Sequence, residues 1–157
     1  NIDCFDIEIN ESDPKKLAEI VIALEPTFGA VNLEDIKAPD CFEVEQLCKQ
    51  KMKIPVFHDD QHGTAIVVGA AAVNAFELSN RKIGESKIVA VGAGASGIAC
   101  LDMLIKLGAK RENIWLCDSK GLIISSRQGL NKEKARFAQD SEPKDVKDLM
   151  IVLYLFT

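Results

Sequence analysis

The sequence predicts an α/β fold in which parallel β-sheets are covered by helices on both faces. Three observations predict it. Short apolar runs alternate with amphipathic stretches, no clear hairpin signal interrupts the alternation, and a glycine-rich turn joins one apolar run to the helix that follows it. In such sheets ligands bind at the carboxyl ends of the strands. The polar residues at those ends are therefore the candidates for function.

The first half of the chain alternates between expected strands and helices. Residues 4–9 alternate apolar and acidic side chains with a period of two, which is typical of a half-buried strand. The stretch Ser12-Asp13-Pro14 supplies an N-cap and an early proline for a helix whose apolar residues share one face. Further strands are expected over residues 28–33 and 54–57, and further helices over residues 41–52 and 64–78. The helix over residues 64–78 consists mostly of small apolar residues, so we expect it to pack closely against its neighbours.

The alternation of strands and helices restarts in the second half, after a polar connecting segment at residues 81–87. The expected elements are strands over residues 88–91 and 114–117, a helix over residues 96–107, a loop with some helix over residues 119–143, and a last strand in the apolar run at residues 150–156. We expect a domain boundary near residue 81. Both ends read as cut, since the chain opens without Met and closes on an apolar strand, so we expect a fragment.

Length, charge and cysteine content narrow the function classes. At 157 residues and 17.2 kDa the chain can bury a core without disulfides or a structural metal. The net charge of -5 comes from scattered charges, which argues against nucleic acid as a partner. Five cysteines without a C-x-x-C pair indicate a reducing cytoplasm. The apolar runs are much shorter than the roughly 18 residues of a membrane span, so no membrane anchor is expected.

Two pairs of carboxylates follow neighbouring expected strands. Glu34 and Asp35 come after the strand at residues 28–33, and Asp59 and Asp60 come after the strand at residues 54–57. If these strands are adjacent, four carboxylates meet at one edge of the sheet, where a proton or a cation must offset their repulsion. Oxygen ligands select a hard cation such as Mg²⁺ or Mn²⁺ and leave sites open for a chelating anion.

Two other interpretations of this segment stay open. The acids could be solvated and cap the helices that follow, a role that suits Asp60 or Gln61. His58 and His62 have the i, i+4 spacing of a zinc pair, but they lie in the turn before a helix and no Glu follows His58. A histidine beside acidic ligands more often donates a hydrogen bond to them.

The turn at residues 92–97 has the sequence G-x-G-x-x-G between an apolar strand and a helix. Gly92 would make the tight turn, Gly94 would let a pyrophosphate approach the backbone, and Gly97 would let the helix pack close to the strand. Asp118 ends the next strand and could bind an adenosine ribose. We therefore predict that the C-terminal half is a partial Rossmann-type doubly wound domain that binds NAD or NADP.

The sequence leaves the choice between NAD and NADP open. Asp118 would repel a 2′-phosphate, whereas nearby basic side chains could offset that repulsion by pairing with it directly. The same basic side chains could equally form a solvated face. They are Lys120, Arg127, Lys132, Lys134 and Arg136.

Three stretches together resemble the bacterial malic enzymes. They are PTFGAVNLEDIKAP at residues 26–39, IPVFHDDQHGTA at residues 54–65, and the glycine-rich turn with DSKG at residues 118–121. The resemblance covers roughly residues 1–140. It implies that residues 1–80 are the C-terminal part of the catalytic, metal-binding domain and that residues 81–157 are the truncated N-terminal part of the NAD(P)-binding Rossmann domain.

The resemblance also implies an activity, the oxidative decarboxylation of (S)-malate to pyruvate and CO₂ with NAD(P)⁺ and Mg²⁺ or Mn²⁺. It makes Glu34, Asp35 and Asp60 the metal ligands and places Asp59 behind them, orienting the lysine base of the family. Thr64 would lie near the cofactor. The pyrophosphate would lie over Gly92, Gly94, Ser96 and Gly97. The full-length parent is expected to be a homo-oligomer with small-molecule substrates.

The chain departs from the family pattern in its catalytic groups. The catalytic tyrosine and lysine of the family lie in a region that has no counterpart here, and the one tyrosine, Tyr154, lies in the terminal apolar run. We therefore expect an active parent and an inactive 157-residue chain. Two alternatives remain: a metal-free Rossmann oxidoreductase such as an amino-acid dehydrogenase, and a non-catalytic dinucleotide-binding module.

Overall fold

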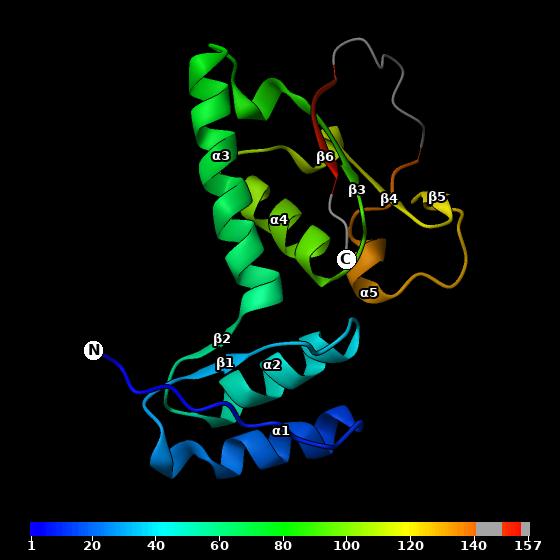
Figure 1. The fold of residues 1–157 in the computed structure, drawn as a ribbon. Coiled ribbons are helices and arrows are strands. Elements are labelled where there is room, and N and C mark those ends of the chain that lie inside the picture. The colour runs from blue at the N-terminus through cyan, green and yellow to red at the C-terminus, as the bar shows by residue number, and fades with distance from the viewer. Residues whose placement is uncertain (141–148, 155–157) are drawn as a thin grey trace. The chain divides into compact units, whose positions relative to one another are not determined.

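The computed structural model describes residues 1–140 and 149–154 of the chain (Figure 1). It divides into two compact units, Asn1–Phe57 and His58–Thr157, and each is described by itself. This division lies upstream of the boundary expected near residue 81, because the long helix α3 (Thr64–Leu78) packs against α4 (Ala95–Lys106) in the second unit. The assignment of residues 1–80 and 81–157 to two domains of a longer enzyme stays a prediction.

The first unit consists of two helices packed together and a small sheet. Its elements are α1 (Pro14–Ala23), β1 (Val31–Leu33), α2 (Asp40–Lys51) and β2 (Val56–His58), with a 3₁₀ turn at Glu25–Thr27. The expected N-cap is confirmed and the structure identifies it as Asp13, whose carboxylate accepts from the backbone N–H groups of Lys15 and Lys16 at 2.9 and 3.1 Å. A core of buried apolar side chains holds the unit together: Ala18, Val21, Leu33, Val44, Cys48, Met52 and Val56.

The strand expected over residues 4–9 is wrong. This segment has no regular structure, and Phe5 leaves 70% of its surface exposed while its ring contacts that of Phe28. Alternating side chains create a face that can be buried, but a strand also needs a neighbour for its backbone hydrogen bonds. The sheet of this unit consists of β1 and β2, and residues 4–9 pair with neither of them.

The second unit is built on a four-stranded sheet. Its elements are α3, β3 (Lys87–Val91), α4, β4 (Ile114–Asp118), β5 (Gly121–Leu122), α5 (Lys132–Ala135) and β6 (Leu149–Tyr154), in the strand order β5-β4-β3-β6. β3 pairs in parallel with β4 on one side and with β6 on the other, which confirms a third parallel strand in the last apolar run. The chain therefore leaves β3 toward β4 and later returns to the opposite side of β3 (Figure 1).

One strand pair differs from the expected all-parallel pattern. β5 pairs antiparallel with β4, so that Asp118 faces Gly121 across a tight turn. Gly121 has a φ of 98°, a backbone region that glycine adopts without the steric cost of a Cβ. The sequence DSKG therefore forms a short hairpin, and this hairpin returns the chain beside the carboxyl end of β4.

Small residues let α3 pack closely on α4, as the sequence predicted. Gly69 is buried in α3, and a Cβ at this position would lie 2.9 Å from Cγ of Met103 in α4. The core of this unit is formed by α4 and the strands, and its fully buried side chains include Ile88, Leu101, Leu104, Ile114 and Leu116. Among the described residues, no helix combines the length and the apolar character needed to cross a bilayer.

Candidate functional site

The glycine-rich turn lies at the carboxyl end of β3, where the strand order reverses. Gly92 has a φ of 112°, which favours glycine, and its N–H donates to the carbonyl of Cys117 at 2.9 Å. In parallel sheets the crevice at such a reversal is where ligands bind, because the connections on its two sides leave in opposite directions. The tight turn that the sequence predicted at Gly92 is confirmed.

Helix α4 begins directly after this turn. Gly94 is its N-cap and has no side chain to accept a hydrogen bond from the first N–H groups of the helix. Ser96 and Gly97 follow in the first turn and are buried. The start of α4 thus combines free backbone donors with the positive end of a helix dipole, the combination that binds phosphate in dinucleotide sites.

The acidic segment after β2 forms a single π-helical turn, Asp59–Gly63, which leads into Thr64 at the start of α3. This π-turn packs against both α3 and α4. A Cβ at Gly63 would overlap the carboxylate of Asp59, so the glycine leaves this side chain the position it has here. The second unit therefore places the segment with Asp59 and Asp60 against the helix that follows the glycine-rich turn.

The other acidic pair lies in the first unit, directly after β1. Glu34 accepts a hydrogen bond from Nδ2 of Asn32 at 2.6 Å, and Asp35 has a φ of 57°. A non-glycine residue in this left-handed region is uncommon and often marks a functional position. β1 and β2 are neighbours in one sheet, as the predicted site requires. The convergence of all four carboxylates, two from each unit, stays a prediction.

Within residues 1–140 and 149–154, no three His, Cys, Asp or Glu side chains are grouped so that they could hold a metal ion. The two histidines of the zinc alternative lie at different places. His58 ends β2 and is fully buried, whereas His62 lies in the π-turn. Neither position is on a regular α-helix, where the i, i+4 spacing would bring both rings to one face.

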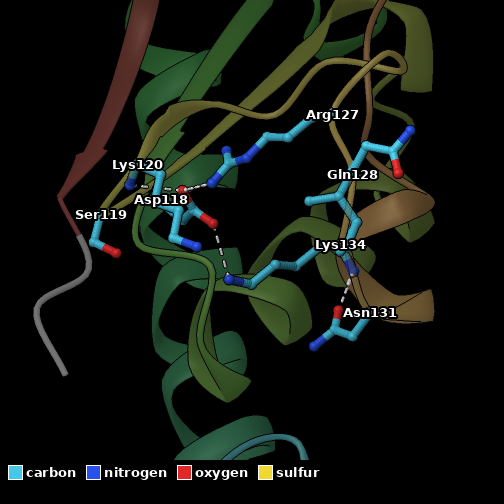
Figure 2. A pocket seen from close by; sticks show the side chains of 9 residues that line it. Asp118, Ser119, Lys120, Arg127, Gln128, Asn131 and Lys134 are labelled. Carbon is cyan, nitrogen blue, oxygen red and sulfur yellow. Dashed lines mark hydrogen bonds and ion pairs between the residues drawn. The ribbon is translucent and has the colours of Figure 1, made fainter.

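Asp118 at the end of β4 is the centre of a charged cluster (Figure 2). Its Oδ1 accepts from Nη2 of Arg127 at 2.6 Å and from the backbone N–H of Lys120 at 2.9 Å. Its Oδ2 accepts from Nζ of Lys134 at 3.0 Å. Both carboxylate oxygens are therefore engaged by donors of the protein itself.

A cavity of about 180 Å³ opens beside this carboxylate. Its lining includes the charged groups of the cluster together with polar residues of the loop that follows β5: Asp118, Lys120, Arg127, Gln128, Asn131 and Lys134. The side chains of Asp118, Arg127 and Lys134 are 10%, 17% and 26% exposed, so they are held at the wall of the cavity and remain accessible from it. The lining carries three cationic side chains and one carboxylate.

Buried anchors hold this loop in place. Ile123 and Phe137 are fully buried, and the guanidinium groups of Arg111 and Arg136 each lie 5.4 Å from the centre of the Phe137 ring. Nη2 of Arg111 also donates to the carbonyl of Ala138 at 2.8 Å. The sequence indicated only a polar loop with some helix here, because these anchors act between residues that are distant along the chain.

The five basic residues considered from the sequence have different positions. Arg127 and Lys134 pair with Asp118, and Lys120 lines the same cavity. By contrast, Lys132 is an exposed residue beside Glu133, and Arg136 pairs with Asp102 of α4 at 2.9 Å. The solvated-face interpretation is therefore wrong for Arg127 and Lys134. One local signal was overlooked: Asn131 three residues before Lys134 is an N-cap, and its Oδ1 accepts from the Lys134 N–H at 2.8 Å.

Acid is expected to weaken the fold through Asp118. Partial burial by itself would raise the pKa of this carboxyl, but the hydrogen bonds from Arg127, Lys134 and the Lys120 backbone outweigh it and lower the pKa to about 2. A carboxylate whose pKa is lower in the folded state stabilises the fold above its unfolded pKa of 3.8, and this contribution is lost as the pH falls through the folded value. We expect the loss to be about 2 kcal/mol between pH 5 and pH 2.

Urea unfolding, followed by the fluorescence of Trp115 on the same strand, measures this contribution. The difference in unfolding free energy between the wild type and Asp118→Asn should be largest near pH 6 and shrink toward pH 2. Asp140→Asn is the matched control, since Asp140 accepts from Ser125 in an exposed pair. A wild-type advantage over Asp118→Asn that stays constant across this pH range would contradict the prediction.

Comparison with known proteins identifies the family. Residues 61–154 match the family model described as malic enzyme, NAD binding domain, and this is more than half of the chain. The chain belongs to the malic enzyme family. The resemblance found in the sequence motifs is thereby confirmed, and so is the α/β fold with parallel strands, which the malic enzyme structures share.

The relatives include malic enzymes of both cofactor types. The NAD-dependent malic enzyme of Rhizobium meliloti is 55% identical over 148 residues, which are 94% of this chain and 19% of the relative. The NADP-dependent malic enzyme of Haemophilus influenzae is 55% identical over 138 residues, which are 87% of this chain and 18% of the relative. The crystal structure of the NAD-dependent malic enzyme of Thermotoga maritima matches with a TM-score of 0.88 and 38% identity, over 99% of this chain and 44% of that chain.

The chain thus spans about a fifth of the length of these two curated malic enzymes. Their equal identity to it means that sequence similarity does not separate an NAD site from an NADP site.

Proposed function

We propose that the chain is part of an enzyme that oxidatively decarboxylates (S)-malate to pyruvate and CO₂, with NAD(P)⁺ accepting the hydride and Mg²⁺ or Mn²⁺ at the substrate site. The observation that carries the proposal is the glycine-rich turn at the reversal of strand order, within a chain of the malic enzyme family. The turn supplies backbone donors at the start of α4 for a pyrophosphate, and Asp118 lies one strand away at the same edge of the sheet.

The acidic residues have the chemistry that a divalent cation requires. Glu34, Asp35 and Asp60 would supply carboxylate oxygens, which are the ligands that Mg²⁺ and Mn²⁺ prefer. A bound ion would supply Lewis-acid stabilisation of the charge that develops on the substrate during decarboxylation. Asp59 would act as a positioning residue for the base, and the absence of a side chain at Gly63 leaves room for its carboxylate.

The proposal extends to the setting of the enzyme. None of the five cysteines forms a disulfide. Cys41, Cys48 and Cys100 are buried, and Cys4 is exposed. Free thiols of this kind support a reducing compartment, and we propose the cytoplasm. We also propose small dicarboxylic and keto acids as the partners of the site and a homo-oligomer as the state of the parent enzyme.

The test is a coupled assay on the protein at its natural chain length. We expect NAD(P)⁺ reduction only when both (S)-malate and Mn²⁺ are present, with one CO₂ released for each nucleotide reduced. The 157-residue chain should bind nucleotide without turnover, because the tyrosine and lysine that the family resemblance requires have no counterpart in it. Reduction that continues undiminished in EDTA would contradict the proposal and favour a metal-free oxidoreductase.

A further inference from the structure

We propose that Asn32 is a positioning residue for Glu34 and that it makes the proposed metal site prefer Mg²⁺ or Mn²⁺ to Ca²⁺. The inference rests on the proposed function, because it takes Glu34 as a carboxylate ligand of the divalent cation. It adds a residue that has no part in the proposed reaction as described above, and it concerns the choice of cation as well as its binding.

The pleat of β1 brings the side chains of Asn32 and Glu34 to the same side of the chain. Leu33 lies between them and is buried in the core of the first unit, against which Val31 also packs. Because successive residues of a strand point to opposite faces, Asn32 and Glu34 are exposed on the other face. The chain turns directly afterwards, since Asp35 has a φ of 57°. Glu34 is therefore held at the end of the strand, within reach of the residue two positions before it.

A short hydrogen bond fixes the orientation of the Glu34 carboxylate. Nδ2 of Asn32 donates to Oε1 of Glu34 at 2.6 Å, a distance typical of strong bonds to a carboxylate. A free glutamate side chain would have to give up several rotamers when it binds an ion, and this bond restricts them in advance. The positive amide hydrogen at Oε1 also disfavours a cation at that oxygen. Glu34 thus offers the ion mainly one oxygen, Oε2.

Ligation through one oxygen suits small cations better than Ca²⁺. Mg²⁺ requires nearly ideal octahedral geometry with short bonds to oxygen, and Mn²⁺ shares its preference for six oxygen ligands. The two oxygens of one carboxylate are too close together to fill two octahedral positions around such an ion. Ca²⁺ is larger, takes six to eight oxygens and often binds both oxygens of a carboxylate. Holding Oε1 of Glu34 on Asn32 therefore removes a ligand atom from Ca²⁺ and none from Mg²⁺ or Mn²⁺.

Metal binding to the parent enzyme at its natural chain length tests the inference without any measurement of turnover. Electron paramagnetic resonance detects free Mn²⁺ in a titration of the metal-stripped protein, and displacement of Mn²⁺ by Ca²⁺ gives the second affinity. We expect Asn32→Ala to weaken Mn²⁺ binding by at least about tenfold and to change Ca²⁺ binding by less than about threefold. The preference for Mn²⁺ over Ca²⁺ should therefore fall by at least about threefold. Asn32→Gln keeps an amide donor and should recover part of the preference.

Two further variants separate this inference from the proposed function. Asn10→Ala is the matched control, because Asn10 is exposed in the segment without regular structure and its loss should leave both affinities unchanged. Glu34→Gln tests the ligand itself and should weaken the binding of both ions. Circular dichroism establishes that each variant is folded.

The possible failures are distinguishable. If Glu34→Gln leaves Mn²⁺ binding unchanged, Glu34 is not a ligand, and both the proposed metal site and the inference are overturned. If Glu34→Gln weakens binding but Asn32→Ala keeps the wild-type ratio of the two affinities, only the role of Asn32 in cation choice is overturned. An equal loss of both affinities in Asn32→Ala has the same meaning.

Discussion

An Asp60→Asn substitution in the parent malic enzyme is expected to lower malate-dependent NAD(P)⁺ reduction by at least about a hundredfold. The amide keeps the shape of the side chain but loses the negative charge that a divalent cation needs. Substitution of residues that only support metal ligands already costs about 10-fold to 100-fold, so the loss of a ligand should cost at least as much. The measurement is a titration of activity with Mn²⁺, in parallel with direct detection of bound Mn²⁺.

Asp6→Asn is the matched control for this substitution. Asp6 lies in the exposed N-terminal segment that has no regular structure, so the same chemical change there should leave activity and Mn²⁺ affinity unchanged. If Asp60→Asn binds Mn²⁺ as tightly as the wild type, Asp60 is not a ligand. The alternative in which the acidic pairs only cap the helices that follow them would then be favoured.

Leu101→Ala is expected to destabilise the second unit by about 3 kcal/mol. Leu101 lies in α4 and is fully buried in the core over the sheet, so its truncation removes apolar contacts and leaves a cavity. Because natural domains are stable by only about 5 to 15 kcal/mol, this loss should lower the melting temperature by roughly 10 °C. It should also weaken nucleotide binding at the proposed site, where the first turn of α4 would bind the pyrophosphate.

Leu78→Ala is the control that separates burial from residue type. Leu78 ends α3 and is 89% exposed, so the same substitution should change the unfolding free energy by less than about 0.5 kcal/mol. Thermal unfolding of both variants and the wild type measures the difference. Similar losses for Leu101→Ala and Leu78→Ala would mean that the packing of α4 does not limit the stability of this unit.

Much of the fold could be predicted because its signals are local. The N-cap at Asp13, the small residues of α3 around Gly69 and the turn at Gly92 each act within a few residues, through hydrogen bonds and steric limits that any chain with this sequence experiences. The strand predicted over residues 4–9 failed for the complementary reason. Its side-chain alternation is local, but the neighbouring strand that it needs is not.

The sequence by itself determined the order of the helices and of the strands β1 to β4, the glycine-rich turn, the acidic residues that follow β1 and β2, and the malic enzyme family. Only the tertiary structure decided which basic side chains reach Asp118. Arg127 and Lys134 are 9 and 16 residues away from it along the chain, and they reach it because the β4–β5 hairpin and the buried Phe137 fold their loop back over the end of β4. Lys132 has the same charge and lies nearer to Asp118 along the chain than Lys134 does, yet it faces solvent beside Glu133. Charge and sequence spacing identify the basic residues that could pair with Asp118, but the path of the backbone determines which of them reach it.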